Sequence, residues 1–323
     1  MDISAKRWGV LSLSVVLLLA LTFGSLSLGS ASFSWTDFGH LESSDTLFWV
    51  SRLPRTIALM LAGSSMAVAG LVLQVVLRNR FIEPDMIGST QSAGLGILLM
   101  TLFVPGAPLI VKAGVGACFA LAGMSLFVRM TRHLRLEGAY MVSLVGMIFG
   151  GIIDAGSQYI AIETETLQLL HVWFTGDFSA ILAGRYEWLW LSGLLTLGIY
   201  GLADRLTITG FGESLSKSLG VHYGLMLALA LILTALITAL DVVTVGRIPF
   251  LGLIVPNVVT RLMGDRLRVS LPIVAISGAN LLMACDILGR ELDYPSEIPV
   301  STLFGLLGAA IFLGLLWRRG ARS

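Results

Sequence analysis

Long apolar stretches recur along the chain, separated by short segments that hold most of its charged residues. A helix that crosses a bilayer needs about 20 mostly apolar residues, and most of these stretches approach or exceed that length. We therefore expect an all-α integral membrane protein, with residues 1–323 forming a single polytopic transmembrane domain. The pattern predicts ten membrane-spanning helices, at residues 8–35, 56–77, 86–104, 107–128, 138–162, 187–203, 221–240, 251–263, 269–285 and 298–317.

The first apolar stretch is open to two interpretations. It carries no charge and follows Lys6 and Arg7, and together with the small residue Ala31 this arrangement also allows a secretory signal peptide. However, the apolar part of a signal peptide spans only about 7–15 residues. We therefore interpret residues 8–35 as an uncleaved first span.

The composition agrees with a membrane protein. Hydrophobic residues make up 56% of the chain and charged residues 13%, and the mean hydropathy is +0.88. A soluble domain carries roughly 25% charged residues, and a disordered chain combines low hydrophobicity with high charge. Both classes are therefore excluded, and the net charge of +1 gives no reason to expect a nucleic-acid partner.

The distribution of Lys and Arg predicts the orientation, because these residues are enriched in cytoplasmic loops. With the N-terminus in the cytoplasm and ten spans, 15 of the 21 basic residues fall inside. The even number of spans also places the C-terminus in the cytoplasm. The six basic residues left outside are Arg52, Arg55, Lys112, Arg185, Arg247 and Arg290.

Three of these outer residues, Arg52, Arg55 and Arg290, lie at the outer ends of the second and ninth spans. As interfacial anchors, they would extend their charged ends toward water. As a docking face, they would pair with the carboxylates of an acidic partner, because Arg binds a carboxylate through two parallel hydrogen bonds. The residues alone leave both interpretations open.

The longest predicted cytoplasmic loop, residues 205–220, contains a short candidate helix. Gly212 and Gly220 bound about seven residues, and Leu215 and Leu219 lie one turn apart, which gives the helix an apolar edge. The segment is either a connector on the membrane surface or a helix offered to a cytoplasmic subunit.

Asp154 interrupts the fifth span about two-thirds of the way along it. A carboxylate inside a span costs about 2.5–3.5 kcal/mol on insertion scales, so Asp154 either faces a transport pathway or lies at the outer interface. Segments with Gly and Pro also recur near the bilayer, where non-helical backbone is tolerated only inside protein or beside a water-filled cavity. These features favour a transporter over a simple membrane anchor.

The sequence lacks three common motifs of nucleotide-binding and hydrolytic enzymes. It lacks the Gly-x-x-x-x-Gly-Lys-Ser/Thr phosphate loop, the zinc-protease helix motif and the Gly-x-Ser-x-Gly elbow. Cys118 and Cys285 lie in apolar runs, and the four His residues are well separated, so neither a disulfide nor a metal site is expected. We expect a transport subunit without a catalytic site or a bound cofactor.

A series of short motifs follows in order from about Arg52 to Trp317. The motif residues are Arg52, Leu53, Pro54 and Arg55; Gln74, Asn79, Pro84 and Gly88; Trp173 and Gly176; Gly212, Glu213, Leu219 and Gly220; Gly246, Ile248, Phe250, Gly252, Leu253, Pro256 and Asn257; and Glu297, Pro299 and Gly308. In their order and spacing they resemble the permease subunits of the iron–siderophore and cobalamin ABC importers. Departures at Arg80, Asn257 and Ala310 leave the branch of the family open.

The resemblance implies a type II importer fold and an assembly with several partners. Two permease subunits, identical or paralogous, form the pore within the membrane lipid. Two ATP-binding subunits hold ATP and Mg²⁺ on the cytoplasmic side, and a siderophore-binding protein docks from the periplasm or cell surface. By position, Arg52, Arg55 and Arg290 would receive carboxylates of the binding protein, and residues 213–220 would be the coupling helix that contacts the ATPase.

The function implied by the resemblance is ATP-driven import of a ferric siderophore through the bacterial inner membrane, with a catecholate siderophore preferred. Cobalamin and haem are alternative ligands, and an ion- or proton-coupled secondary transporter with Asp154 as a relay is the alternative from another class. The further residues expected along the pathway or in the family motifs are Gln74, Asn79, Pro84, Gly88, Trp173, Gly246, Phe250, Gly252, Pro256, Asn257, Glu297 and Pro299.

Overall fold

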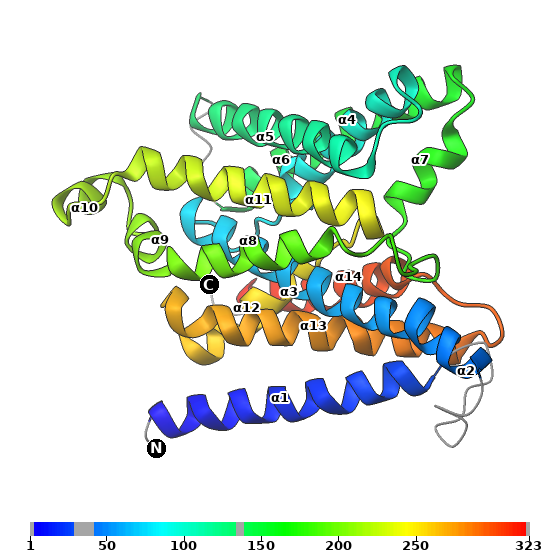
Figure 1. Cartoon of the computed structure of the whole chain (residues 1–323). Helices are drawn as coiled ribbons and strands as arrows, with labels where there is room; N and C mark the ends of the chain where they lie inside the picture. Colours follow the sequence, from blue (N-terminus) through cyan, green and yellow to red (C-terminus); the bar gives the residue numbers. More distant parts are fainter. Residues whose placement is uncertain (1–2, 29–41, 134–138, 321–323) are drawn as a thin grey trace.

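The computed structural model describes residues 3–28, 42–133 and 139–320, and within these ranges it contains helices and no strand. Figure 1 shows the helices packed into one bundle, many of them side by side along a common direction. The end of the predicted first span (residues 29–35), Gly138 at the start of the predicted fifth span, and both chain termini lie outside the described residues.

Ten described helices occupy the ten predicted spans. Six are long and apolar enough to cross a membrane: α1 (Ile3–Ser27), α3 (Leu53–Val76), α5 (Leu109–His133), α6 (Ala139–Glu163), α11 (Tyr223–Val245) and α13 (Leu267–Leu292). Four further apolar helices fill the other stretches: α4 (Ser89–Phe103), α8 (Leu189–Gly201), α12 (Leu251–Met263) and α14 (Val300–Gly320). The predicted all-α membrane fold is therefore confirmed.

Six short elements connect these helices. One of them, α10 (Glu213–Ser218), is the helix predicted in the long cytoplasmic loop. The other five were not predicted, because they are too short to produce an apolar period of their own. They are α2 (Glu42–Leu47), the π-helical turn η1 (Phe48–Arg52), the 3₁₀ turn η2 (Asp85–Ile87), α7 (Leu167–Phe174) and α9 (Ala203–Thr209).

Helix α3 forms the centre of the bundle and contacts α8, α11, α12 and α13. Within the apolar window of its span 78% of the residues are buried, whereas the figure for α1 is 6%. A helix that is apolar all round is either enclosed by protein or surrounded by lipid. Helix α3 is therefore a core element, and α1 packs along α13 while most of its surface faces away from the bundle.

Glycines allow α3 to approach its neighbours backbone to backbone. A Cβ atom at Gly70 would overlap the carbonyl of Gly252 on α12, and a Cβ at Gly63 would lie 2.7 Å from the carbonyl oxygen of Gly278 on α13. Small residues at helix interfaces are typical of membrane proteins, where association depends on close packing. The three helices therefore form one tightly packed unit.

The two ends of the bundle carry different elements. In Figure 1, α10, the start of α1 and the turn between α12 and α13 lie toward one end. Helices α2 and α7 lie toward the opposite end. The segment predicted to be cytoplasmic and the three arginines predicted to be outside thus lie at opposite ends of the bundle.

Candidate functional site

Charged side chains meet at the end of the bundle opposite α10, where α3 begins and α13 ends. Arg55 donates to Oδ1 of Asp286 from Nε (3.2 Å) and Nη2 (2.7 Å), and its Nη1 lies 2.6 Å from Oε2 of Glu297. Arg290, one turn after Asp286 on α13, pairs with the second oxygen of the same carboxylate. The Asp286 side chain is fully buried, so the two arginines supply the partners that a buried carboxylate requires.

Two of the arginines also bind the last backbone carbonyls of α1. Nη1 of Arg52 donates to the carbonyl oxygens of Leu26 (2.8 Å) and Ser27 (2.6 Å), and Nη1 of Arg290 donates to that of Ser25 (3.1 Å). The last four carbonyls of a helix have no partner within it, and positive charge at this end interacts favourably with the helix dipole. Arg52 and Arg290 therefore attach the end of α1 to α3 and α13.

The three arginines are consequently buried within the chain. Arg52, Arg55 and Arg290 expose only 5%, 9% and 5% of their surface. Their guanidinium groups point toward internal acceptors, which the sequence pattern could not reveal. Docking of a partner at these residues is not tested by the contacts within one chain and stays a prediction.

Two predicted motifs that are far apart in the sequence meet where the segment after α3 packs against α12. Pro256 lies inside α12 and has no N–H to donate to the carbonyl of Gly252, four residues earlier. Nε2 of Gln74 donates to that carbonyl instead, at 3.1 Å. Nδ2 of Asn257 donates to the carbonyl oxygen of Arg80 at 2.7 Å. Side-chain amides thus satisfy backbone groups that the non-helical segment and the proline leave free.

The non-helical segment between α3 and α4 is held by its own polar side chains. Oδ1 of Asn79 accepts from the N–H of Phe81 at 2.9 Å, and Oε1 of Glu83 accepts from the N–H of Phe250 at 3.0 Å. Phe250 has a φ of 63° and precedes α12, while Gly88 has a φ of 75° and precedes α4. The motif residues therefore shape two helix starts, and the buried Pro84 directly precedes the turn η2.

Arg247, in the loop between α11 and α12, joins two carboxylates. Its Nε and Nη2 lie 2.5 and 3.0 Å from the two oxygens of Asp85, and its Nη1 lies 3.1 Å from Oδ2 of Asp154 on α6. The guanidinium carbon also lies 5.8 Å from the centre of the Phe174 ring at the end of α7. Asp154 therefore has a charged partner, and its Oδ1 is buried without a hydrogen bond to the described residues.

Beside Arg247, the backbones of three segments cross. The N–H of Asp177 donates to the carbonyl of Val245 (3.1 Å), and the N–H of Ser301 in α14 donates to the carbonyl of Gly176 (3.1 Å). A Cβ atom at Gly176 or at Gly246 would overlap the crossing backbone. These two motif glycines therefore permit contact between the segments that follow α7 and α11, close to the start of α14.

Two further predicted residues lie at the edges of this region. Trp173 on α7 is half-buried, and Nζ of Lys112 lies 6.0 Å from the centre of its ring. Pro299 directly precedes α14, and its carbonyl accepts from the N–H of Thr302 at 3.0 Å. Both are thus placed near the end of the bundle that carries α7.

At the opposite end, α10 lies between the two glycines that the sequence indicated. Gly212 precedes the helix with a φ of 102°, and Gly220 follows it with a φ of 75°, a conformation that favours glycine. Within the helix, Glu213 and Lys217 form an ion pair of 2.8 Å. The predicted short helix is therefore present, and it is six residues long.

One face of α10 is attached to the chain and another is exposed. Oγ of Ser216 is buried and lies 3.1 Å from the carbonyl oxygen of Ile208 on α9 and 2.6 Å from that of Gly212. Leu215 and Leu219 are 44% and 56% exposed, and Phe211 just before the helix is 58% exposed. Exposed apolar side chains gathered in this way are typical of a protein interface.

A comparison with known protein families decides what kind of protein carries this arrangement. The model of the FecCD transport family matches residues 17–318. The chain belongs to the FecCD transport family. This confirms the resemblance to permeases of the iron–siderophore and cobalamin ABC importers.

Individual relatives of this FecCD protein match it over nearly its whole length. The petrobactin import system permease protein YclN of Bacillus subtilis is 40% identical over 308 residues, which cover 95% of this chain and 97% of that protein. The ferric-anguibactin transport system permease protein FatD of Vibrio anguillarum is 37% identical over 273 residues, or 84% and 87% of the two chains. One solved structure is described as a metal-chelate type ABC transporter in an inward-facing conformation. It matches with a TM-score of 0.80 at 26% sequence identity, and the match covers 96% of this chain and 99% of that chain.

Several residues of this FecCD permease gain their importance only from the structure. The predicted ninth span ends at Cys285, but α13 continues to Leu292 and includes Asp286 and Arg290, which form an ion pair one turn apart. Asp85 and Arg247 were not singled out as partners of Asp154. The available signal was that each is a charge within or beside an apolar stretch, and such charges usually have a partner.

Proposed function

We propose that this FecCD permease imports a ferric siderophore across the bacterial inner membrane, driven by ATP hydrolysis on partner subunits. The observation that carries the proposal is the 40% identity to the petrobactin import permease over 95% of the chain. The 37% identity to the ferric-anguibactin permease supports the same substrate class. The preference for a catecholate siderophore within that class stays a prediction.

The proposed assembly contains two permease subunits, two ATP-binding subunits that hold ATP and Mg²⁺, and a binding protein on the outer side. Each permease is a single domain, residues 1–323, that crosses the membrane ten times with both termini in the cytoplasm. The position of α10 toward the same end as the start of α1 supports this orientation (Figure 1).

In this proposal α10 is the contact with the ATP-binding subunit. Its exposed leucines, Leu215 and Leu219, would insert into an apolar cleft of the partner. The buried Ser216 packs α10 against Ile208 of α9, so a movement of the ATP-binding subunits would be passed on to the neighbouring helices. No covalent chemistry on the substrate is required.

The transport pathway is proposed to run beside α6, α7 and α14, where Asp154 and Arg247 lie. Asp85 holds Arg247 through two hydrogen bonds and Asp154 holds it through one. Helix α6 can therefore move away from the loop between α11 and α12 when the single Arg247–Asp154 bond opens, while Asp85 keeps the guanidinium in place. Alternating access needs contacts of this kind, which open and re-form in each cycle.

The binding protein is proposed to dock at the end of the bundle that carries the three arginines. A partner carboxylate would reach Arg55 by replacing Glu297, whose side chain is 19% exposed. The buried Asp286 would keep the Arg55 guanidinium in position during this exchange. Arg52 and Arg290 would add positive charge to the docking face while they hold the end of α1.

The substrate class is tested by reconstituting the chain with its ATP-binding subunit in proteoliposomes and adding the cognate binding protein. Uptake of a radiolabelled ferric siderophore, of cobalamin and of haem is then compared at the same concentration. We expect ATP-dependent accumulation of the ferric siderophore alone. Accumulation of cobalamin or haem without the siderophore would contradict the proposed substrate.

A further inference from the structure

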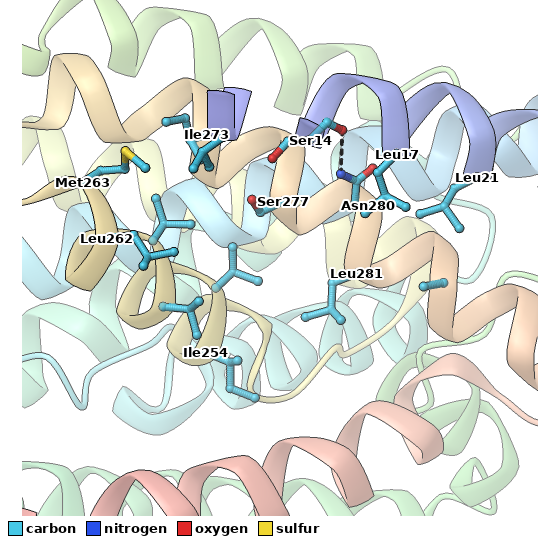
Figure 2. Close-up of a pocket in the computed structure, with 15 residues that line it drawn as sticks. Ser14, Leu17, Leu21, Ile254, Leu262, Met263, Ile273, Ser277, Asn280 and Leu281 are labelled. Atoms are coloured by element: carbon cyan, nitrogen blue, oxygen red, sulfur yellow. Dashed lines mark hydrogen bonds between the residues drawn. The ribbon is translucent and has the colours of Figure 1, made fainter. Parts of the chain in front are cut away.

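An apolar groove lies between α1, α12 and α13, and its lining residues are different from those discussed above. Figure 2 shows its walls, which include Leu17 and Leu21 from α1, Leu262 from α12, and Ile273 and Leu281 from α13. The groove has a volume of about 420 Å³. Helix α1 packs on α13 and α3, so the space that it leaves beside α12 forms the groove.

The length of the groove matches one leaflet of a bilayer. Its lining residues on α1 extend from Val10 to Leu21, which corresponds to about 16 Å along a helix. This is about half of the 30 Å hydrocarbon core of a bilayer. The Val10 end lies toward the end of the bundle that carries α10 (Figure 1), so the groove crosses the proposed cytoplasmic leaflet.

The groove is open to the surroundings of the protein. Leu17, Val258 and Leu262, which line it, expose 47%, 44% and 49% of their surface. In a membrane such side chains contact acyl chains. An acyl chain is therefore chemically suited to this surface.

By their spacing on α1 and α12, two arginines continue the lined helix faces toward the proposed cytoplasmic interface. Arg7 precedes the lining residues Val10 and Ser14 by three and seven positions, and Arg261 follows Val258 and Ile254 by the same intervals. Residues at these spacings share a helix face. Neither arginine forms an ion pair with the residues that the structure describes, and Nε of Arg7 is buried without a hydrogen-bond partner there.

We propose that the groove between α1, α12 and α13 binds one anionic phospholipid of the cytoplasmic leaflet. One acyl chain would lie along the groove, and the phosphate would contact Arg7 and Arg261. Basic sites between helices on the cytoplasmic side of a membrane bind anionic headgroups, and Arg matches the geometry of a phosphate. The lipid would complete the packing between α1 and α12.

A second copy of the chain fits this groove less well than a lipid does. A two-fold related copy would present the same surface and would thus bring Arg7 and Arg261 close to their own counterparts. These like charges would repel each other, whereas a phosphate would neutralise them. The charge of the groove entrance therefore favours the phospholipid.

The proposal is tested with the full-length protein, purified in detergent and freed of lipid. Native mass spectrometry then follows binding of phosphatidylglycerol and of phosphatidylcholine with identical acyl chains. We expect one phosphatidylglycerol per chain, retained about tenfold more strongly than phosphatidylcholine. Equal retention of the two lipids would overturn the proposal.

Variants locate the site. Arg7→Gln combined with Arg261→Gln should remove the preference for phosphatidylglycerol, and Ser277→Phe, which fills the groove, should lower retention of the lipid. Arg205→Gln is the matched control, because Arg205 on α9 is exposed, lies outside the groove and has no ion pair within the described part of the chain. Size-exclusion profiles and circular dichroism show that each variant is folded.

Three results would contradict the proposal. The double arginine variant could keep the full preference, or Arg205→Gln could lose it to the same extent. Alternatively, a cysteine placed at Leu262, in a chain whose Cys118 and Cys285 are replaced by Ser, could cross-link two copies while no lipid is retained. That last result would assign the groove to a second permease.

Discussion

Asp286 is shared by Arg55 and Arg290, and its side chain is fully buried. Removing one partner of a buried ion pair leaves an uncompensated charge and costs about 3–5 kcal/mol. We therefore expect Asp286→Ala to lower the thermal unfolding temperature of the detergent-purified protein strongly. The measurement is unfolding followed by circular dichroism or by an intrinsic fluorescence shift.

The matched control for this variant is Asp265→Ala. Asp265 pairs with Arg80 at 2.8 Å, but the side chains are 68% and 40% exposed. An exposed pair contributes about 0–1 kcal/mol, so the unfolding temperature should change little. An equally small effect of Asp286→Ala would mean that the buried cluster is not needed for stability.

Glu297 competes with the proposed partner carboxylate for Arg55. Replacing Glu297 with Gln removes the competing charge, so we expect the Kd of the binding protein for the permease to fall several-fold. Surface plasmon resonance at low ionic strength measures this, since salt screens such contacts. Glu291→Gln, an exposed change at the end of α13, is the control, and weaker docking of the Glu297 variant would contradict docking at Arg55.

At the residue scale the sequence could indicate which side chains are unusual but not which ones meet. Arg55, Arg290 and Glu297 stood out through motif and position. Asp286, the common partner of the two arginines, did not, because it lies 231 positions from Arg55 and just beyond the predicted span. Pairing across such separations depends on how the helices pack, and a local sequence pattern does not reveal this packing.

The contact between α3 and α12 is tight enough to make a single methyl group costly. A Cβ at Gly70 would overlap the carbonyl of Gly252, and overpacking typically costs about 1–3 kcal/mol. We expect Gly70→Ala to lower both the yield and the unfolding temperature of the permease. Gly156→Ala on α6, where a Cβ meets nothing within 4 Å, is the control, and equal behaviour of the two variants would contradict this close packing.

Because the leucine edge of α10 is exposed, the coupling of ATP hydrolysis to transport can be tested without disturbing the fold. Leu219 is 56% exposed, so Leu219→Asp should leave the permease folded in the membrane. Because the contact with the ATP-binding subunit would be lost, we expect uptake to fall about tenfold or more while ATP hydrolysis continues. Both rates are measured in the reconstituted complex.

Ser218→Asp is the control for this change, since it adds the same charge to α10 outside the apolar edge. It should retain most of the uptake. Normal uptake by Leu219→Asp would remove α10 as the coupling helix. Loss of uptake in both variants would mean that added charge, rather than the leucine edge, is responsible.

The helical elements were largely predictable because long apolar runs determine them. Even the short span α12 has the predicted bounds, 251–263. The sequence pattern missed α7, which has eight residues, and the turn η2, which has three. Elements of this length are stabilised by their neighbours rather than by their own sequence.

At the scale of the whole molecule, the chain has the features of a subunit that depends on partners. It contains no phosphate-binding loop, and it exposes an apolar edge on α10 at one end of the bundle. The family was predictable from the order and spacing of the motifs along the sequence. The ligand was not, since no described side chain identifies one siderophore.

The central claim is that ATP hydrolysis by a partner drives transport through this chain. It is tested most directly by uptake of a ferric siderophore into proteoliposomes that contain the permease with or without its ATP-binding subunit, the binding protein being present in both. We expect accumulation against a gradient only with the ATP-binding subunit and ATP. Accumulation by the permease alone, driven by an imposed ion or proton gradient, would contradict the account and favour a secondary transporter with Asp154 as its relay.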